Sequence, residues 1–279
     1  MFGIILISIS TFFEEISNVI GKSKAARHEE SPYTMAFLSI FWMVVCFFAI
    51  VILDPDSFTF SAKSIPTFAL RVVLEIVQWY LYVFAVIKAD RTMFSFVRTL
   101  TIPLLLLTDI FLGYDTGIVT IVGIFIIVFT LFLAFSNGVL KRKGLKFVVF
   151  SAVNAVLTTS LLKYDIAHYN SIVAEQVSVH SISLVFFFVL AMMKSRENPL
   201  RLLIRPGFFI QSITIGVSGF IESFAYDYGL ASVIVTAKRA FGILWSIFTG
   251  NIYFKEKRLA FKIGIATLIT LGLACLAQK

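Results

Sequence analysis

Residues 231–254, ASVIVTAKRAFGILWSIFTGNIYF, decide how the rest of the chain is interpreted. The stretch is long enough to cross a bilayer as a helix, because a helical span needs about 20 mostly apolar residues. Its first half nevertheless carries Lys238 and Arg239 side by side. A charge inside a membrane is costly unless it faces a cavity or a partner, so such charges mark functional positions. This pair is therefore the first indication of a site within a membrane domain.

The composition of the whole chain agrees with this interpretation. Hydrophobic residues make up 59% of the 279 positions, 31 residues are Phe, and charged residues make up only 14%. So little polar surface excludes a water-soluble globular protein. Apolar runs of about 20 residues recur along the chain, which predicts an all-α integral membrane protein and not an outer-membrane barrel. The first run contains Glu14 and Glu15 and lacks a basic leader and a cleavage site, so we expect a first span and not a signal peptide.

The apolar runs predict ten transmembrane helices joined by short connections. Their expected ranges are 3–20, 34–53, 66–87, 91–112, 117–136, 146–163, 173–193, 206–228, 231–253 and 259–277. A shift of 140 residues lays the second half of the sequence on the first, so that Arg98 falls on Lys238. Because five is an odd number of helices, the second copy enters the membrane from the opposite side. We therefore expect one membrane domain of two inverted five-helix repeats, 1–137 and 138–279.

The distribution of charge predicts the orientation. The net charge is +8, and the cations gather in the connections after the odd-numbered helices: Lys22, Lys24, Arg27, Lys88, Arg91, Lys141, Arg142, Lys143, Lys146, Lys194, Arg196, Arg201, Arg205, Lys255, Lys257 and Arg258. The opposite face has only Lys63, Lys163 and Lys279. The positive-inside rule then places both termini on the non-cytoplasmic side of a cytoplasmic membrane. The same rule explains the basic composition without a nucleic-acid partner.

The last two predicted helices read AKRAFGILWSIFTGNIYFKEKRLAFKIGIATLITLGLACLA. A Lys-Arg pair, a small-residue face, a Lys-Glu turn and a glycine-containing last helix resemble the ten-helix EamA-type members of the drug/metabolite transporter superfamily. ISTFFEEISNVIGKSKA near the N-terminus resembles the first helix of that group, with Glu14 and Glu15 where small or aromatic residues are expected. GYDTG, residues 113–117, replaces the usual Gly-Glu turn after the fourth helix. The resemblance implies alternating-access transport through a central cavity lined by helices 1–4 and 6–9, and it specifies no substrate.

Three cations are the main candidates for binding a solute. Arg98 and Lys238 are repeat equivalents, so an inverted two-fold axis would place them symmetrically about the cavity, with Arg239 beside them. Guanidinium and ammonium groups suit carboxylate or phosphate, which predicts a site for an anionic group. Adjacent helical residues diverge by about 100°, so Lys238 and Arg239 cannot both point at one spot. The alternative is that these cations only form structural ion pairs with Glu14, Glu75 or Glu222.

Polar residues at helical spacing add further candidates. In the third helix the row is Arg71, Glu75, Gln78 and Tyr82, and its repeat equivalents are Gln211, Ile215, Ser218 and Glu222. A polar row facing acyl chains is costly, so both rows are expected to face inward. We expect the solute to contact Gln78, Tyr82, Ser218 and Glu222.

Acidic residues are the candidates for proton coupling, because burial raises the pKa of a carboxyl group and an approaching cation lowers it. Glu14 is the first candidate, Glu222 the second, and Glu75 completes the set. Asp109 lies near a helix end, where its carboxylate can reach the interface.

Other reactive side chains show no pattern of a site. Glu175, His168 and His180 lack metal-ligand or catalytic spacing and are interpreted as capped or interfacial residues. Cys46 and Cys275 are interpreted as buried thiols. No nucleotide, zinc or nucleophile motif is found, so the sequence predicts neither a metal, a cofactor nor an enzyme.

Two residues are candidate hinges. Pro103 lies within the fourth helix, where its missing N–H and its ring kink or break a helix. Gly242 lies near the equivalent position of the ninth helix. A static kink that improves packing is the alternative for both. Gly264 and Gly272 give the tenth helix a small-residue face, which can pack within the chain or join two chains as a homodimer through helices 5 and 10.

The sequence thus predicts a secondary transporter that moves a small anionic or zwitterionic metabolite by alternating access, with a proton or a counter-solute as the coupled species. One alternative is an exporter of cationic or hydrophobic compounds that uses the intramembrane carboxylates. The other is a membrane subunit that transports nothing.

Overall fold

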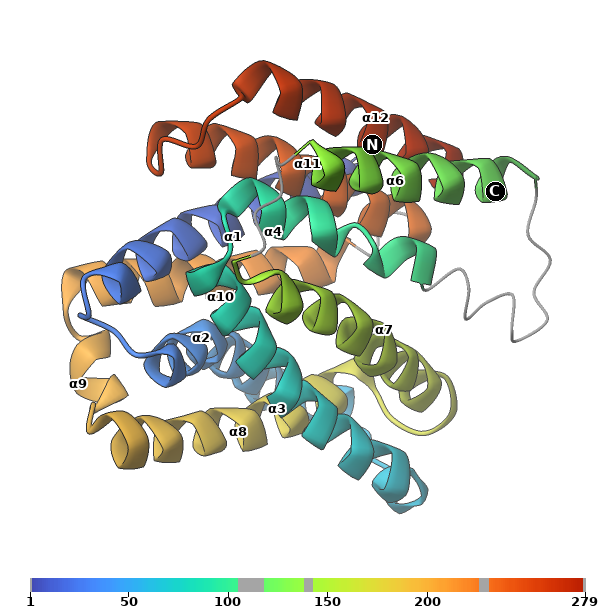
Figure 1. The fold of residues 1–279 in the computed structure, drawn as a ribbon. Helices are drawn as coiled ribbons and strands as arrows, with labels where there is room; N and C mark the ends of the chain where they lie inside the picture. Colours follow the sequence, from blue (N-terminus) through green and yellow to red (C-terminus); the bar gives the residue numbers. More distant parts are fainter. Residues whose placement is uncertain (1, 105–117, 138–142, 226–230, 278–279) are drawn as a thin grey trace. The chain divides into compact units, whose positions relative to one another are not determined.

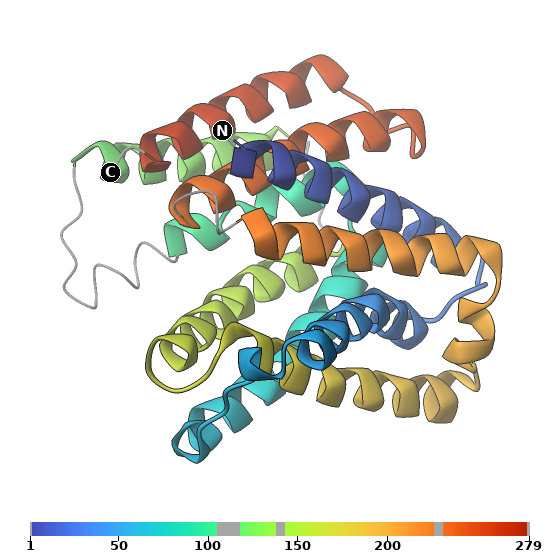
Figure 2. The ribbon, with the colours of Figure 1, turned by 180° about the vertical axis from the view of Figure 1, so that it is seen from behind.

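The computed structural model describes residues 2–104, 118–137, 143–225 and 231–277, and within them the secondary structure is helical (Figure 1 and Figure 2). The main helices are α1 (Phe2–Ala26), α2 (Pro32–Leu53), α3 (Ile65–Lys88), α4 (Arg91–Arg98), α6 (Ile118–Ser136), α7 (Leu145–His168), α8 (Ile172–Leu190), α10 (Pro206–Ala225), α11 (Ala231–Ile252) and α12 (Leu259–Ala277). Shorter elements are η1 (Pro55–Ser57), η2 (Ala62–Ser64), the π-helical turn η3 (Ala191–Ser195) and α9 (Pro199–Leu203).

Several helical stretches are long and apolar enough to cross a membrane. Among the described residues, five qualify by length and composition: Phe2–Ala26, Pro32–Leu53, Pro55–Lys88, Leu145–His168 and Ile172–Ser195. Shorter apolar helices cover Ile121–Ala134 and Leu259–Cys275. Large apolar side chains of α6, such as Phe125 and Phe132, are exposed, as side chains that contact lipid would be. The chain therefore has the features of an all-α, multi-pass membrane protein.

A helix lies in each of the ten predicted ranges, but some helix ends differ from the prediction. α1 continues to Ala26, beyond the predicted end at residue 20. The segment predicted as a connection, residues 194–205, contains α9. The side chain of Asn198 accepts hydrogen bonds from the N–H groups of Leu200 and Arg201, and Pro199 takes the first helical position. Asn followed by Pro is a helix-start signal that the apolar pattern alone does not contain.

The break predicted at Pro103 is present in the fourth helix. α4 ends at Arg98, and helical structure resumes at Thr101. Thr99 and Leu100 donate their N–H groups to carbonyls three residues earlier, which is a tighter turn than the α-helix. Pro103 has no N–H to donate to the carbonyl of Thr99, and its ring crowds that carbonyl. Use of this break as a hinge stays a prediction, and Asp109 and residues 113–117 lie outside the described part of the chain.

Contacts divide the chain into two compact units, which we call unit 1 (Met1–Glu15, Lys88–Val153 and Ile221–Lys279) and unit 2 (Ile16–Ile87 and Asn154–Phe220). Each unit takes corresponding segments from both halves of the sequence. In unit 1, α4 packs against α11 and α6 against α12. In unit 2, α2 packs against α8. In each of these pairs the two helices occupy equivalent positions of the predicted repeats.

The two glycines of α12 have different surroundings in unit 1. A Cβ at Gly272 would lie 2.7 Å from a side-chain carbon of Ile127 in α6, so Gly272 permits close packing within the chain. A Cβ at Gly264 would meet no atom within 4 Å, because Gly264 lines an open groove beside α6. Within the chain, Gly272 therefore has the predicted close-packing role and Gly264 does not. The homodimer stays a prediction.

Glu30 is a buried carboxyl group in the connection between α1 and α2, in unit 2. It is only 4% exposed, and its Oε1 accepts a hydrogen bond of 2.8 Å from Nε2 of Gln211. Burial raises the pKa of Glu30 from 4.5 to about 8, although the Gln211 hydrogen bond and the charge of Lys24 act in the opposite direction. Glu30 therefore favours its protonated form in the folded protein.

Glu30→Gln is expected to stabilise the protein at alkaline pH and to change little at pH 5. Because the folded pKa lies above the unfolded one, the stabilising contribution of Glu30 is complete below the unfolded pKa. It is lost as the pH rises through the folded pKa of about 8. Glutamine keeps the acceptor for Gln211 and cannot ionise. Thermal unfolding of both proteins in detergent at pH 5 and pH 9 measures the effect, and equal changes in Tm at the two pH values would contradict it.

Candidate functional site

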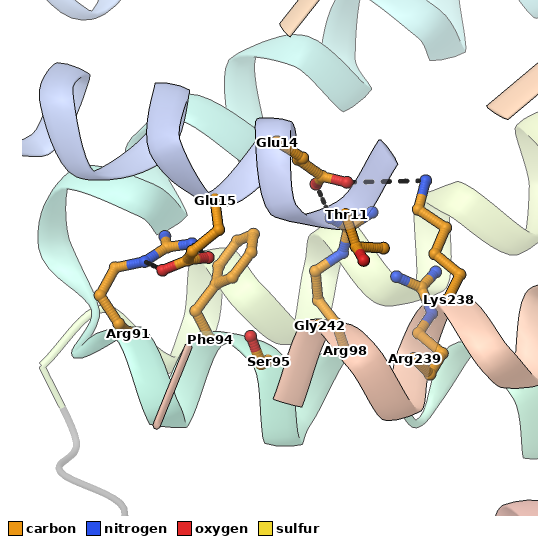
Figure 3. Close-up of a pocket in the computed structure, with 10 residues that line it drawn as sticks. All are labelled: Thr11, Glu14, Glu15, Arg91, Phe94, Ser95, Arg98, Lys238, Arg239 and Gly242. Carbon is orange, nitrogen blue, oxygen red and sulfur yellow. Dashed lines mark hydrogen bonds and ion pairs between the residues drawn. The ribbon is translucent and has the colours of Figure 1, made fainter. Parts of the chain in front are cut away.

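In unit 1, side chains of α1, α4 and α11 enclose a small pocket (Figure 3). The residues that line it are Thr11, Glu14, Glu15, Arg91, Phe94, Ser95, Arg98, Lys238, Arg239 and Gly242. On α1 and α4 they lie three, four or seven positions after the first of them, and on α11 Gly242 lies four positions after Lys238, with Arg239 beside Lys238. Each helix therefore contributes mainly one face. The cavity volume is about 30 Å³. Since one water molecule needs about 10–15 Å³ on this measure, the pocket holds two or three waters or one small charged group.

Glu14 lies between cations of two different helices. Its Oε1 is 3.7 Å from Nη1 of Arg98 in α4, and its Oε2 is 3.7 Å from Nζ of Lys238 in α11. Figure 3 shows both ion pairs and both cationic side chains directed toward this carboxylate. These distances exceed those of hydrogen bonds, so the attraction is one between charges without a direct N–H···O contact. Lys238 also donates a hydrogen bond of 2.6 Å to Oε2 of Glu222.

Glu15 and Arg91 form a much tighter pair at the other end of the lining. Nε and Nη2 of Arg91 donate hydrogen bonds of 3.0 and 2.5 Å to the two oxygens of Glu15. The hydroxyl of Thr249 donates to the same carboxylate. Arg91 is only 1% exposed. Such a two-point, buried pair fixes the geometry between α1, α4 and α11. The charge pattern alone counts Arg91 among the cations of a cytoplasmic connection. In the structure, Arg91 is instead a buried partner of Glu15.

Glu256, in the connection between α11 and α12, holds the start of α4 in place. Its Oε1 accepts the N–H of Arg91 at 2.7 Å, and its Oε2 accepts the hydroxyl of Thr92 at 2.6 Å. Asp90, which precedes α4, makes no side-chain capping bond. The carboxylate of Glu256 thus caps α4 from another element and orients the face that carries Arg98.

The lining of the pocket carries more positive than negative charge. Among the described residues that line it, the cations are Arg91, Arg98, Lys238 and Arg239, and the carboxylates are Glu14 and Glu15. With Glu222, the hydrogen-bond partner of Lys238, four cations face three carboxylates. A small enclosed space with this composition suits a carboxylate or phosphate group.

The predicted site residues fall into both units. Arg98, Lys238, Arg239, Glu14 and Gly242 line the pocket of unit 1, and Glu222 is bonded to Lys238. Pro103 also belongs to unit 1, and Gln78, Tyr82, Ser218 and Glu75 belong to unit 2.

Protein side chains contact the predicted polar residues of α3. Tyr82 donates to Oδ1 of Asn18 at 2.8 Å. Gln78 accepts from Nδ2 of Asn154 at 3.1 Å. Contact of these residues with a solute stays a prediction.

Gly242 leaves open space beside α11 and does not interrupt this helix. α11 runs without interruption from Ala231 to Ile252, and a Cβ at Gly242 would meet no atom within 4 Å. Because Gly242 lines the pocket, this space belongs to the site. Its use as a hinge stays a prediction.

Glu175 and His180 have partners inside unit 2 that sequence reasoning did not find. Glu175 is fully buried and pairs with Arg71, and His180 is 5% exposed and lies 3.7 Å from Glu75. Their position at a membrane interface stays a prediction. Sequence reasoning also missed Arg91 and Ser95 as lining residues. Their signal is the spacing to Arg98, since residues 91, 95 and 98 share one helical face.

Comparison of the sequence with protein-family models and with curated proteins gave no match in either case. The function proposed for the chain therefore depends on the chemistry of this pocket.

Proposed function

We propose that the chain is a secondary transporter of the drug/metabolite type, and that the pocket of unit 1 binds the anionic group of a small anionic or zwitterionic solute. The observation that carries the proposal is the position of Glu14, 3.7 Å from both Arg98 and Lys238. Two cations from separate helices share one carboxylate without hydrogen-bonding it. A solute carboxylate or phosphate has more freedom to reach the distance of about 2.7–2.9 Å at which charged N–H groups bind oxygen.

Binding is then an exchange of counter-ions. The solute anion takes the place of Glu14 beside Arg98 and Lys238, and Glu14 loses the cations that favour its ionised form. A carboxylate that loses its cationic partners in a membrane interior takes up a proton more easily. This exchange links occupancy by an anion to protonation of Glu14, while the tight pair of Glu15 and Arg91 keeps the helices together.

The proposed architecture is ten spans in two inverted repeats, with both termini on the non-cytoplasmic side. Pairing of repeat-equivalent helices within the units, α4 with α11 and α2 with α8, supports it. Because the pocket volume is only about 30 Å³, a metabolite larger than its anionic group enters only when the surrounding helices move. Rocking of the repeats would supply that movement.

Lys238→Gln is expected to reduce uptake of the transported anion by roughly 10- to 100-fold, because a hydrogen bond to a charged group contributes about 1.5–3 kcal/mol. The protein is reconstituted in liposomes, and uptake of labelled succinate, glutamate, phosphate and, as a cation, tetraphenylphosphonium is measured. Lys146→Gln is the matched control, since Lys146 is exposed in the first turn of α7. Anion uptake that survives Lys238→Gln would contradict the proposal. Uptake of the cation alone, lost in Glu14→Gln, would favour the exporter alternative.

A further inference from the structure

We propose that Glu75 of α3 and His180 of α8 form a proton-binding site in unit 2, separate from the pocket lined by Arg98 and Lys238. Oε1 of Glu75 lies 3.7 Å from Nε2 of His180. The two side chains are only 14% and 6% exposed. Both residues lie inside stretches that are apolar and long enough to cross a membrane, Pro55–Lys88 and Ile172–Ser195.

The hydrogen bond at the far side of the imidazole determines where a proton can bind. Nδ1 of His180 lies 2.9 Å from the carbonyl oxygen of Gln176. A carbonyl oxygen only accepts, so Nδ1 carries the hydrogen. In the neutral ring Nε2 then has its lone pair free to accept, on the side of Glu75. The pair therefore binds one further proton, either as a carboxylic acid beside a neutral ring or as a carboxylate beside an imidazolium. In both forms its net charge changes from −1 to 0.

The neighbouring charged pair on the same helices is of a different kind. Arg71, one turn before Glu75, is ion-paired with Glu175, one turn before His180 on α8. Glu175 also accepts from Asn170, and Arg71 also donates to Gln176. Both members of this pair are at most 2% exposed. The two side chains of this pair carry opposite charges, so the pair is neutral overall. Glu75 instead faces a group whose charge depends on a proton.

Neutral groups complete the surroundings of the site. The indole of Trp79 meets the ring of His180 edge-on at 6.4 Å between centroids, and also that of Tyr82 at 5.7 Å. From α7, Asn154 bonds to Gln78 one turn further along α3, and Asp165 accepts from Thr67 two turns earlier. Among the charged groups on the described helices, Arg71 acts electrostatically on both Glu75 and His180. Arg71 is at the same time the ion-pair partner of Glu175. A carboxylate whose cationic neighbour is already paired with another carboxylate is costly in a membrane, which favours a proton as its partner.

The role of this proton rests on the proposed function: in a transporter, it is a coupling ion that binds to residues other than those of the anion pocket. Glu14 then responds to the solute, and the pair of Glu75 and His180 responds to pH. If the pair had only a structural role, two well-packed apolar side chains in its place would stabilise the fold equally well.

Nuclear magnetic resonance of ¹⁵N-histidine tests the inference on the full chain in lipid nanodiscs between pH 4 and 9. The exposed His28 and His168 serve as internal references, and His180→Gln assigns the third signal. We expect Nδ1 of His180 to keep its hydrogen throughout. The Nε2 signal should change in one step as the pair takes up its proton, either because Nε2 binds the proton or because protonated Glu75 donates a hydrogen bond to it, and Glu75→Gln should move or remove that step. Signals of the two reference histidines should stay unchanged, and an unchanged Tm shows that the variant is folded.

A titration of Nε2 that has the same midpoint in Glu75→Gln, or no titration in either protein, would overturn the inference. Glu75→Asp, which keeps the carboxylate, should retain the coupled titration and provides a second variant. Lys238→Gln should leave the titration in place, because it changes only the anion pocket. Absence of anion uptake by the wild-type protein, together with an intact titration, would therefore count against the transporter and not against the proton site.

Discussion

Glu256→Ala is expected to lower the free energy of unfolding by about 3–5 kcal/mol, the cost of removing one partner of a buried ion pair. The carboxylate of Glu256 accepts from the N–H of Arg91, the hydroxyl of Thr92 and Nζ of Lys262, at 2.6–2.7 Å. Lys262 is only 5% exposed, so alanine leaves a buried ammonium group without its counter-charge. It also removes the cap of α4, and α4 presents Arg98 to the pocket. Unfolding in mixed detergent micelles measures the loss.

Two variants separate the parts of this effect. Glu256→Gln keeps one acceptor oxygen, enough for the N–H of Arg91, and should cost less than alanine. Addition of Lys262→Met to Glu256→Ala removes the orphaned charge and should restore part of the lost stability. If the double variant is as unstable as the single one, the buried ammonium group is not the cause.

The contribution of Glu256 should also depend on pH. Burial raises the pKa of Glu256, but the hydrogen bonds from Lys262, Thr92 and the Arg91 N–H outweigh it and lower the pKa below its usual value. A depressed carboxyl pKa contributes stability that is present above the unfolded pKa and is lost as the pH falls through the folded one. The difference between wild type and Glu256→Gln should therefore shrink on acidification below the usual glutamate pKa.

Gly242→Leu is expected to abolish anion uptake without destabilising the protein. A Cβ at this position meets no atom within 4 Å, so the added side chain enters the pocket. Its methyl groups fill a cavity of about 30 Å³ and leave no room for an anionic group between Arg98 and Lys238. Leucine is also the better helix former, by somewhat less than about 1 kcal/mol. Uptake and Tm are measured on the same preparation.

Gly264→Leu is the matched control, because a Cβ at Gly264 also meets open space but lies in the groove beside α6. It should transport normally. Gly242→Ala, with one added carbon, should give an intermediate uptake. Normal transport by Gly242→Leu would show that the solute does not use this pocket.

Local signals in the sequence predicted the helices and some of their defects. Apolar runs located helices in all ten ranges, because a span needs its apolar length whatever its neighbours are. The break before Pro103 was also predictable, since proline removes a backbone donor from its own helix. The start of α9 at Asn198 and Pro199 was missed, although its signal is local, because it lies in a polar segment where apolar periodicity is absent.

Side-chain pairing separates what the sequence alone determined from what required the tertiary structure. The sequence determined the helical membrane fold and the three basic candidates Arg98, Lys238 and Arg239, because apolar length and the cost of intramembrane charge act on each segment by itself. Only the tertiary structure decided that Arg91 pairs with Glu15 and that His180 faces Glu75. The partners in these pairs are far apart in the chain, and each helix rotation depends on how its neighbours pack. Spacing along one helix determines which side chains share a face, whereas packing between helices determines what that face meets.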